Sequence, residues 1–301
     1  MSCPICAATE GWPFPHAASP QIEAWRAEIG ETDRYFWTLC RGCGNGYPSV
    51  PPDPRVLASY WAANRVVDTL DDAGQAAVWR YRIDTARLGA QRVWRTYAPL
   101  FEGRPGKFEG RFLDVACGLG ETVDLFRRQG WTSEGIDVDA ATKRFHDALG
   151  IVTRIGRFED DASSSQYDLI LIAHAIYFIT DPLEFLRQVK TRLAPGGIFA
   201  IVISDLLAST DNGKPAYAHT FYPCASSMRA ALARAGFETL FTRTLSGSIY
   251  LAAKPAENID ASIDTRLINL RWRSKPLRHA VLGRPNMALR RAAKRLLGQG
   301  R

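Results

Sequence analysis

Four of the six cysteines stand in two closely spaced pairs, Cys3 with Cys6 and Cys40 with Cys43. Each pair has the Cys-x-x-Cys spacing that presents two thiolates to one ion, and two such pairs complete a closed tetrahedral site. In a chain of the cytosol this spacing indicates metal rather than disulfides. We therefore predict a structural zinc ion bound by these four thiolates, with His16 as a substitute ligand that the site does not need.

A second group of residues has the types and spacing of a nucleoside site. Residues 113–121 read Leu-Asp-Val-Ala-Cys-Gly-Leu-Gly-Glu between a predicted strand and a predicted helix. Gly118 and Gly120 would let the backbone turn tightly and approach a ligand closely. About 20 residues later, Asp137 ends the next predicted strand, where its carboxylate can accept hydrogen bonds from both ribose hydroxyls.

The elements that must position these residues alternate between strands and helices after residue 111. Asp181, Pro182 and Glu184 form a helix start, because Asp caps the helix, Pro fits its first turn and Glu completes a capping box. We expect this helix to stop at 195–197 and a later helix to be capped by Ser226. Alternation of this kind predicts a parallel sheet covered on both faces. Predicted strands cover 112–116, 132–137, 151–155, 167–173, 198–204, 237–243 and 248–253, and the first two helices cover 121–129 and 140–149.

The predicted fold is therefore α/β, a Rossmann-like and mostly parallel seven-stranded sheet with helices on both faces. A zinc-ribbon-like module precedes it and a basic helical tail follows it. The expected division is 1–50 for the zinc-binding module, 51–104 for a helical connector, 105–255 for the α/β domain and 256–301 for the tail. The apolar positions of the connector are Trp61, Val66, Val67, Leu70, Val78, Tyr81 and Leu88.

The ordered motifs of the α/β domain resemble the class I S-adenosylmethionine-dependent methyltransferases. The resemblance begins at Asp114-Val-Ala-Cys-Gly-Leu-Gly, where a third glycine typical of dinucleotide-binding folds is replaced by Val123. It continues through Gly135-Ile-Asp, Tyr167-Asp-Leu-Ile-Leu, Asp181-Pro, Leu193-Ala-Pro-Gly-Gly and Ala235-Gly-Phe. It covers roughly residues 105–253 and implies an enzyme that uses S-adenosylmethionine.

The resemblance implies a role for each matching residue at the cofactor site. Asp114 and the backbone from Ala116 through Cys117 and Gly118 to Gly120 would line the methionine part of the cofactor. Asp137 would hold the ribose and Val138 would lie against the adenine. Phe158 and Glu159 match the segment that borders the adenine ring, although the family often has Asp where this chain has Arg157. Cys117 also suits a small packing role.

Two histidines and a tyrosine stand where the methyl acceptor is expected. His174 follows the strand whose end faces the methyl group in this family, and His219 lies in a segment that commonly covers the acceptor pocket. A hydroxyl or carbon acid must lose a proton during transfer, so our hypothesis is that His219 is the general base while His174 and Tyr177 orient the acceptor. The alternatives are that His174 is a core histidine and that His219 and Tyr177 only pack.

The combination of a two-knuckle module with a class I domain is similar to sugar C-methyltransferases and to enzymes associated with bacterial surface polysaccharides. This implies a small metabolite, sugar or glycan acceptor with O- or C-methylation. The sugar enzymes carry a further C-terminal domain that this chain does not match. Two other functions stay open, an RNA-base methyltransferase with zinc knuckles and a non-enzymatic adaptor with a degenerate fold.

The charge of the chain is unevenly distributed. Residues 254–301 hold twelve basic and three acidic residues, a net charge of +9, while the remainder holds 26 basic and 28 acidic residues, a net of −2. An acidic body is a poor surface for a phosphate backbone, which makes nucleic acid the less favoured partner. Leu289, Ala292, Ala293, Leu296 and Leu297 recur at helical spacing among basic residues. Such a helix could contact an anionic membrane, touch nucleic acid or pack on the domain.

The first residues contain no basic region followed by an apolar run, and no uncharged apolar stretch reaches 18 residues. We therefore expect no signal peptide and no membrane span. The expected location is the cytoplasm, with peripheral membrane contact through the tail as the open alternative.

Overall fold

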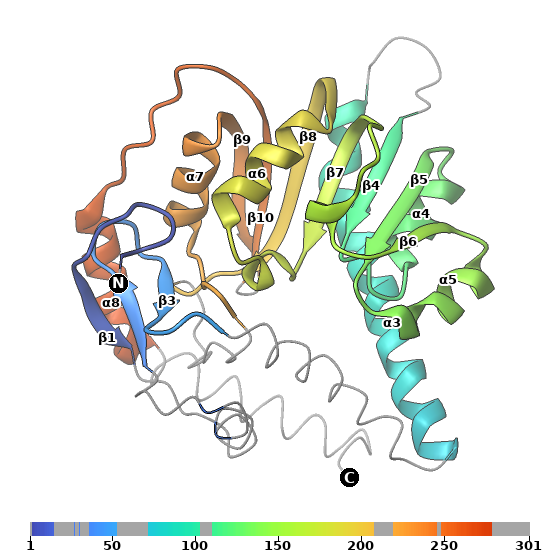
Figure 1. Cartoon of the computed structure of the whole chain (residues 1–301), viewed down its shortest axis with the longest axis horizontal. Coiled ribbons are helices and arrows are strands. Elements are labelled where there is room, and N and C mark those ends of the chain that lie inside the picture. Colours follow the sequence, from blue (N-terminus) through green and yellow to red (C-terminus); the bar gives the residue numbers. More distant parts are fainter. Residues whose placement is uncertain are drawn as a thin grey trace.

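The computed structural model describes residues 2–14, 27, 30, 36–52, 72–102, 110–207, 219–245 and 248–278. Figure 1 shows one large sheet with helices against it, and a small sheet beside the end of that large sheet. The predicted substitute ligand His16, the first part of the connector and the basic helix around Leu289 lie outside the described residues.

The large sheet has seven strands in the order β6-β5-β4-β7-β8-β10-β9. The five strands from β6 to β8 run parallel, and β10 is antiparallel to both of its neighbours. The predicted α/β class and seven-stranded sheet are confirmed. The strands are β4 (Arg111–Val115), β5 (Thr132–Asp137), β6 (Val152–Ile155), β7 (Tyr167–Ala173), β8 (Leu193–Ser204), β9 (Phe237–Leu245) and β10 (Ser248–Pro255).

Helices cover both faces of this sheet, because side chains alternate along its buried strands. In β7, Leu169 and Leu171 pack in one cluster with Phe126 of α4 and Tyr97 of α3. Ile170 and Ile172 pack in the other cluster with residues of α6 and α7. The helices are α3 (Asp72–Tyr97), α4 (Glu121–Arg128), α5 (Lys143–Leu149), α6 (Pro182–Thr191), α7 (Ala225–Arg234) and α8 (Thr265–Arg278). Short 3-10 turns are η2 (Ala98–Phe101), η3 (Ala140–Thr142), η4 (Phe158–Asp160) and η5 (Ile176–Phe178). Among the described residues, no helix is long and apolar enough to cross a membrane.

The small sheet is antiparallel, in the order β1-β2-β3. Its strands are β1 (Gly11–Phe14), β2 (Trp37–Cys40) and β3 (Gly46–Pro48). Trp37 and Leu39 of β2 are fully buried in a cluster with Leu206, Tyr222 and Ile268, which belong to the segment after β8, the segment before α7 and helix α8. The cysteine-bearing module is therefore packed into the rest of the molecule.

Helix α8 contacts this module, although its residues belong to the segment predicted as a separate tail. The indole of Trp272 stacks on that of Trp12, with 6.5 Å between ring centroids. Lys275 is buried, and its Nζ donates a hydrogen bond to the carbonyl oxygen of Leu206 at 2.6 Å. Residues 265–278 therefore belong to the folded body.

Three local expectations differ from the structure. Helix α6 ends at Thr191, earlier than 195–197, because Leu193 already pairs with Tyr167 in the sheet. Helix α7 is capped by Cys224 and not by Ser226, since Cys224 exchanges hydrogen bonds with Ser227 in a capping box. Two of the apolar positions predicted in the connector, Tyr81 and Leu88, are exposed, and α3 instead buries Ala90, Val93 and Tyr97.

Candidate active site

The loop between β4 and α4 forms the centre of the site at the carboxyl ends of the parallel strands. Ala116, Gly118 and Gly120 all have positive φ, at 58°, 56° and 81°. Such angles are costly for residues other than glycine. The amide of Cys117 donates to the carbonyl oxygen of Ile136 at 3.2 Å, and the amide of Gly118 donates to the Asp137 carboxylate at 2.7 Å. The glycine loop is thus tied to the end of β5 by two hydrogen bonds.

Gly118 and Gly120 of this loop have different surroundings. A Cβ built on Gly118 would meet no atom within 4 Å, so the space beside it is open. A Cβ built on Gly120 would lie 2.3 Å from Cδ1 of Ile151 and 3.0 Å from Cδ2 of His146. Gly118 therefore leaves room for a ligand, whereas Gly120 is required by packing.

Asp137 presents a pre-oriented carboxylate at the end of β5. Its Oδ2 accepts the amide of Gly118 and its Oδ1 accepts the amide of Asp139 at 2.8 Å. Burial raises the pKa of this carboxyl, although the two amides act to lower it. A carboxylate has about four lone-pair sites, so both oxygens can still accept ribose hydroxyls.

Asp114 is a fully buried carboxyl at the end of β4. Its Oδ1 is shielded from solvent and has no hydrogen-bond partner among the described residues. Burial, and then repulsion from Asp137, raises its pKa well above the ordinary value. A buried polar atom without a partner is unfavourable, so this carboxyl is the kind of group that a ligand donor would satisfy.

His146 of α5 is a site residue that no sequence motif indicated. Its ring is fully buried, and its Nε2 lies 2.7 Å from the carbonyl oxygen of Gly118 and 3.9 Å from Sγ of Cys117. The Sγ of Cys117 in turn lies 2.7 Å from where a Cβ of Gly135 would be. His146 and Cys117 therefore pack behind the glycine loop and hold its shape.

The residues expected near the adenine have different exposures. Val138 is 50% exposed beside Asp137, so its side chain can lie against a ligand. Phe158 is buried, and its ring contacts Phe185 at 5.4 Å between centroids, so its side chain belongs to the core. Glu159 forms an ion pair with Arg157 at 3.0 Å.

The predicted acceptor residues Tyr177 and His219 come together. Their ring centroids are 4.2 Å apart, and the rings of Phe178 and Tyr222 lie 5.1 and 5.3 Å from that of His219. Thr220 fastens this segment to η5, because its amide and hydroxyl both donate to the carbonyl oxygen of Tyr177, at 2.8 and 3.0 Å. His219 is 9% exposed and is enclosed by aromatic rings.

His174 directly follows β7 and has a positive φ of 54°, which is uncommon for a residue other than glycine. Its amide donates to the carbonyl oxygen of Val202 at 2.7 Å. The residue is exposed to solvent, although desolvation by the atoms around its ring lowers the pKa of the imidazole.

The four paired cysteines converge on one point. Their Sγ atoms all lie within 4.8 Å of one another, with Cys3 3.5 Å from Cys43 and Cys6 3.4 Å from Cys40. None of them forms a disulfide. The predicted arrangement of four thiolates around one centre is therefore present.

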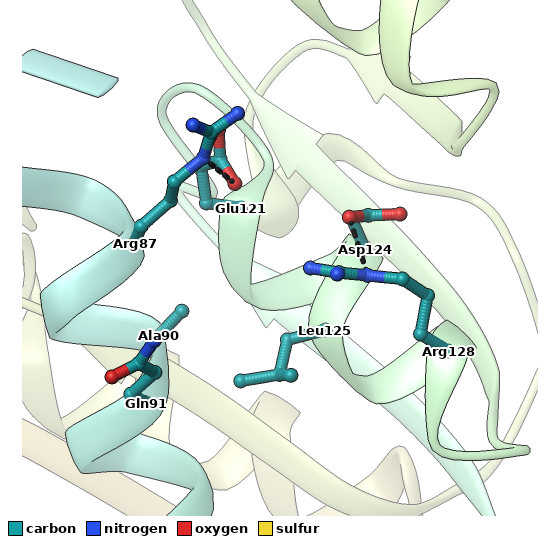
Figure 2. A pocket seen from close by; sticks show the side chains of 7 residues that line it. All are labelled: Arg87, Ala90, Gln91, Glu121, Asp124, Leu125 and Arg128. Carbon is teal, nitrogen blue, oxygen red and sulfur yellow. Dashed lines mark hydrogen bonds and ion pairs between the residues drawn. The ribbon is translucent and has the colours of Figure 1, made fainter. Parts of the chain in front are cut away.

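A separate cavity of about 430 Å³ lies between α3 and α4 (Figure 2). Figure 2 shows Arg87 of α3 paired with Glu121 of α4 across it, and Arg128 paired with Asp124 within α4; the N–O distances are 3.2 and 2.9 Å. Its carboxylates are thus already neutralised, and none of the predicted site residues lines it.

A family model described as "Methyltransferase domain" matches residues 79–241, more than half of the chain. The chain belongs to the methyltransferase domain family. The match spans the glycine loop, Asp137, His174 and His219, and the predicted family is confirmed.

Curated relatives of this methyltransferase-family chain share part of its sequence. The ubiquinone biosynthesis O-methyltransferase of Caulobacter sp. (strain K31) is 32% identical over 103 residues, which are 31% of this chain and 41% of that protein. The protein of the same name from Dinoroseobacter shibae is 33% identical over 119 residues, which are 37% of this chain and 45% of that protein. The chain thus spans less than half the length of these relatives.

Solved structures resemble the chain at low sequence identity. The glycopeptide N-methyltransferase MtfA in complex with S-adenosylmethionine is 16% identical, with 52% of this chain and 92% of that chain covered at a TM-score of 0.42. An S-adenosylmethionine-dependent methyltransferase from Clostridium acetobutylicum is 12% identical, with 48% and 84% covered at a TM-score of 0.41. The family assignment does not depend on them.

Proposed function

We propose that this protein transfers a methyl group from S-adenosylmethionine to a hydroxyl group of a small metabolite or sugar-like acceptor. The observation that carries the proposal is the glycine loop tied to Asp137, with open space beside Gly118, inside a methyltransferase domain. The relatives named O-methyltransferases favour an oxygen acceptor over a carbon acceptor.

The described residues fit S-adenosylmethionine. Asp137 would accept the ribose hydroxyls, and Val138, half exposed next to it, would lie against the adenine. The Asp114 carboxyl, whose Oδ1 has no hydrogen-bond partner among the described residues, would face the methionine part of the cofactor. When bound, the sulfonium supplies the electrophilic methyl group. Because Phe158 is buried in the core and Glu159 is paired with Arg157, the border of the adenine would use the backbone of this turn.

His219 is the proposed general base for an acceptor hydroxyl. Proton removal by a placed imidazole is an established contribution to such displacements. The aromatic rings around His219 restrict its orientation, and Thr220 fastens the segment to η5. Tyr177, whose ring contacts that of His219, and the exposed His174 would orient the acceptor.

The four cysteines fit a structural zinc ion. Four sulfur atoms within 4.8 Å of one another match a tetrahedral thiolate site with Zn–S bonds of about 2.3 Å. All four ligand positions would be filled by protein, so this ion would have no open position for catalysis. Its proposed role is to hold β1, β2 and β3 against the domain.

The experiment that tests the proposed function is a calorimetric titration with S-adenosylmethionine and S-adenosylhomocysteine, with wild type beside Asp137→Ala. We expect micromolar binding that weakens at least ~10-fold in the variant, as for the loss of a charge-assisted hydrogen bond. Glu238→Ala, which removes an exposed carboxylate from the edge strand β9, is the control and should bind as wild type does. A folded wild-type protein that binds neither compound would disprove the proposal.

Once binding is established, release of S-adenosylhomocysteine reports turnover in a screen of hydroxylated acceptors. Sugars, sugar phosphates and phenols form the set, with matched amines as the comparison. Turnover with amines alone would contradict oxygen methylation while leaving the cofactor assignment intact.

A further inference from the structure

Two arginines lie against one tryptophan at the junction of α3 and α5. The Cζ of Arg82 is 5.0 Å from the centroid of the Trp79 ring, and the Cζ of Arg144 is 4.9 Å from it. Arg144 also lies 4.8 Å from the ring centroid of Phe145. The rings of Trp79 and Phe145 are themselves 4.8 Å apart. We call these four residues the arginine–tryptophan cluster.

The cluster includes two residues of helix α5, the helix that supports the glycine loop. Arg144 and Phe145 directly precede His146, whose ring contacts the carbonyl oxygen of Gly118. Trp79 and Arg82 lie one turn apart on α3, so they share a face of that helix. Helix α5 therefore carries His146 toward the glycine loop and presents Arg144 to α3.

The two guanidinium groups have no acidic partner. Among the described residues, neither Arg82 nor Arg144 forms an ion pair or a hydrogen bond, whereas the neighbouring Lys143 pairs with Asp147. Both charges lie against one indole, so their Cζ atoms are at most about 10 Å apart, a distance over which like charges still repel. An anion bound close to both guanidinium groups would reduce this repulsion.

The indole adds a further donor without an acceptor. Nε1 of Trp79 is shielded from solvent and has no hydrogen-bond partner among the described residues. A shielded donor of this kind is unfavourable unless an acceptor reaches it. Planar guanidinium groups match the oxygens of a phosphate, and stacking on aromatic rings restricts their orientation before the ligand arrives.

We propose that the arginine–tryptophan cluster binds a phosphate group. We further assign this phosphate to the methyl acceptor, because α5 carries both Arg144 and the residue His146 that contacts the glycine loop; this assignment rests on the proposed methyl transfer. The acceptor class is then a phosphate ester, such as a sugar phosphate or a nucleotide-linked sugar. The phosphate would anchor one end of the acceptor while its hydroxyl reaches the Tyr177–His219 side.

The test is calorimetric titration with inorganic pyrophosphate at low ionic strength. The variant Arg82→Gln/Arg144→Gln is compared with wild type and with Arg80→Gln/Arg92→Gln, which removes the same charge from exposed positions of α3. We expect wild type to bind, the first variant to bind at least ~10-fold more weakly and the control to stay within about twofold. Thermal unfolding of each variant shows that it is folded.

Two outcomes would overturn the site. The first is that wild type binds neither pyrophosphate nor vesicles measurably. The second is that the Arg80→Gln/Arg92→Gln control loses as much pyrophosphate affinity as the Arg82→Gln/Arg144→Gln variant, because this would indicate diffuse electrostatic attraction. Vesicles containing phosphatidic acid form a separate arm. If they bind through Arg82 and Arg144 while pyrophosphate does not, the phosphate group is that of a lipid headgroup.

Titration after saturation with S-adenosylhomocysteine tests the assignment to the acceptor. Unchanged or tighter pyrophosphate binding supports it, since acceptor and cofactor must be bound together. Competition between the two would overturn it and place the anion in the cofactor site. Failure of the proposed methyl transfer would be seen separately, as absence of S-adenosylmethionine binding by a protein that still binds pyrophosphate.

Discussion

Two carboxyl groups buried at neighbouring strand ends oppose the stability of the ligand-free protein. Asp137 is compensated by two backbone amides, whereas Oδ1 of Asp114 has no partner among the described residues. Burial and the proximity of Asp137 raise the pKa of Asp114. A destabilising carboxyl of this kind is consistent with the proposed ligand-binding role of Asp114, since function and stability commonly conflict at binding sites.

Replacing Asp114 by Asn should therefore stabilise the ligand-free protein and weaken cofactor binding. The folded-state pKa of Asp114 is raised, so its contribution to stability is present below the unfolded-state pKa and is lost as pH rises through the folded-state pKa. We expect the variant to gain ~1–2 kcal/mol in free energy of unfolding near neutral pH and little below pH ~4. Denaturant titrations across this range measure the difference.

The exposed Asp160→Asn variant is the control for this experiment and should show no such pH-dependent gain. A difference between Asp114→Asn and wild type that stays constant with pH would contradict the role of burial. Unchanged affinity for S-adenosylhomocysteine would contradict a position at the cofactor.

Replacing His219 by Phe separates packing from chemistry at the acceptor side. Phe keeps an aromatic ring beside Tyr177 and Tyr222, so the enclosure should persist. We expect turnover with an acceptor from the screen to fall at least ~100-fold, as for a lost general base. Affinity for S-adenosylhomocysteine should stay within about twofold. Turnover equal to that of wild type would rule out His219 as the base.

At the scale of elements, one short bridge of hydrogen bonds joins the cysteine-bearing module to residues 219–224, the segment that carries His219 and that we call the acceptor segment. The amide of Gly46 donates to the carbonyl oxygen of Tyr222 at 2.8 Å, and the amide of Tyr222 donates back at 2.7 Å. Next to it, the Sγ of Cys224 lies 3.6 Å from the carbonyl oxygen of Cys43. The proposed metal ligand Cys43 therefore directly contacts the end of the segment that carries His219.

Removal of the metal should consequently loosen the acceptor segment more than the cofactor loop. Without an ion, four thiolates cannot hold the two knuckles together, because metal binding supplies the folding free energy of such sites. Hydrogen exchange measured with and without a chelator, under reducing conditions, should increase in β1–β3 and in 219–224. Exchange in 116–120 should change little. Added zinc should restore protection, and unchanged exchange in 219–224 would contradict the coupling.

Some elements could be predicted from the sequence because the determinants are local. The bounds of β5 and β7 agree with the prediction, since apolar residues and flanking turns mark both. The start of β8 could not be predicted, because it depends on pairing between Leu193 and Tyr167, 26 positions apart. The start of α7 at Ala225 likewise depends on its N-cap, the thiol of Cys224, which no capping rule includes.

The candidate site likewise contains residues that the sequence could predict and residues that it could not. Asp137 and the glycine loop follow from the order of strand, turn and helix, which a sequence displays. His146 could not be found, because its contact with Gly118 joins residues 28 positions apart and α5 carries no motif. The packing role of Gly120 was hidden for the same reason, since Ile151 and His146 meet it only in the folded chain.

At the scale of the whole molecule, one buried cluster joins three parts of the chain. This cluster contains residues of the module, of the segments after β8 and before α7, and of α8. They are Trp37, Leu39, Leu206, Tyr222 and Ile268. Lys275 adds a buried hydrogen bond from α8 to Leu206. Because these parts share one core, we expect the module, the domain and α8 to unfold together and not as separate units.

Replacing Ile268 by Ala tests this expectation, with Leu270→Ala on the same helix as its control. Ile268 is 1% exposed and Leu270 is 65% exposed. Loss of the buried side chain should cost ~2–5 kcal/mol, whereas loss of the exposed one should cost less than ~0.5 kcal/mol. Denaturant unfolding should remain a single transition at a lower midpoint in Ile268→Ala, and zinc should be released within that transition. Two separate transitions, with zinc released in only the first, would contradict this expectation. They would mean that the module unfolds independently of the domain and that α8 stabilises only the module.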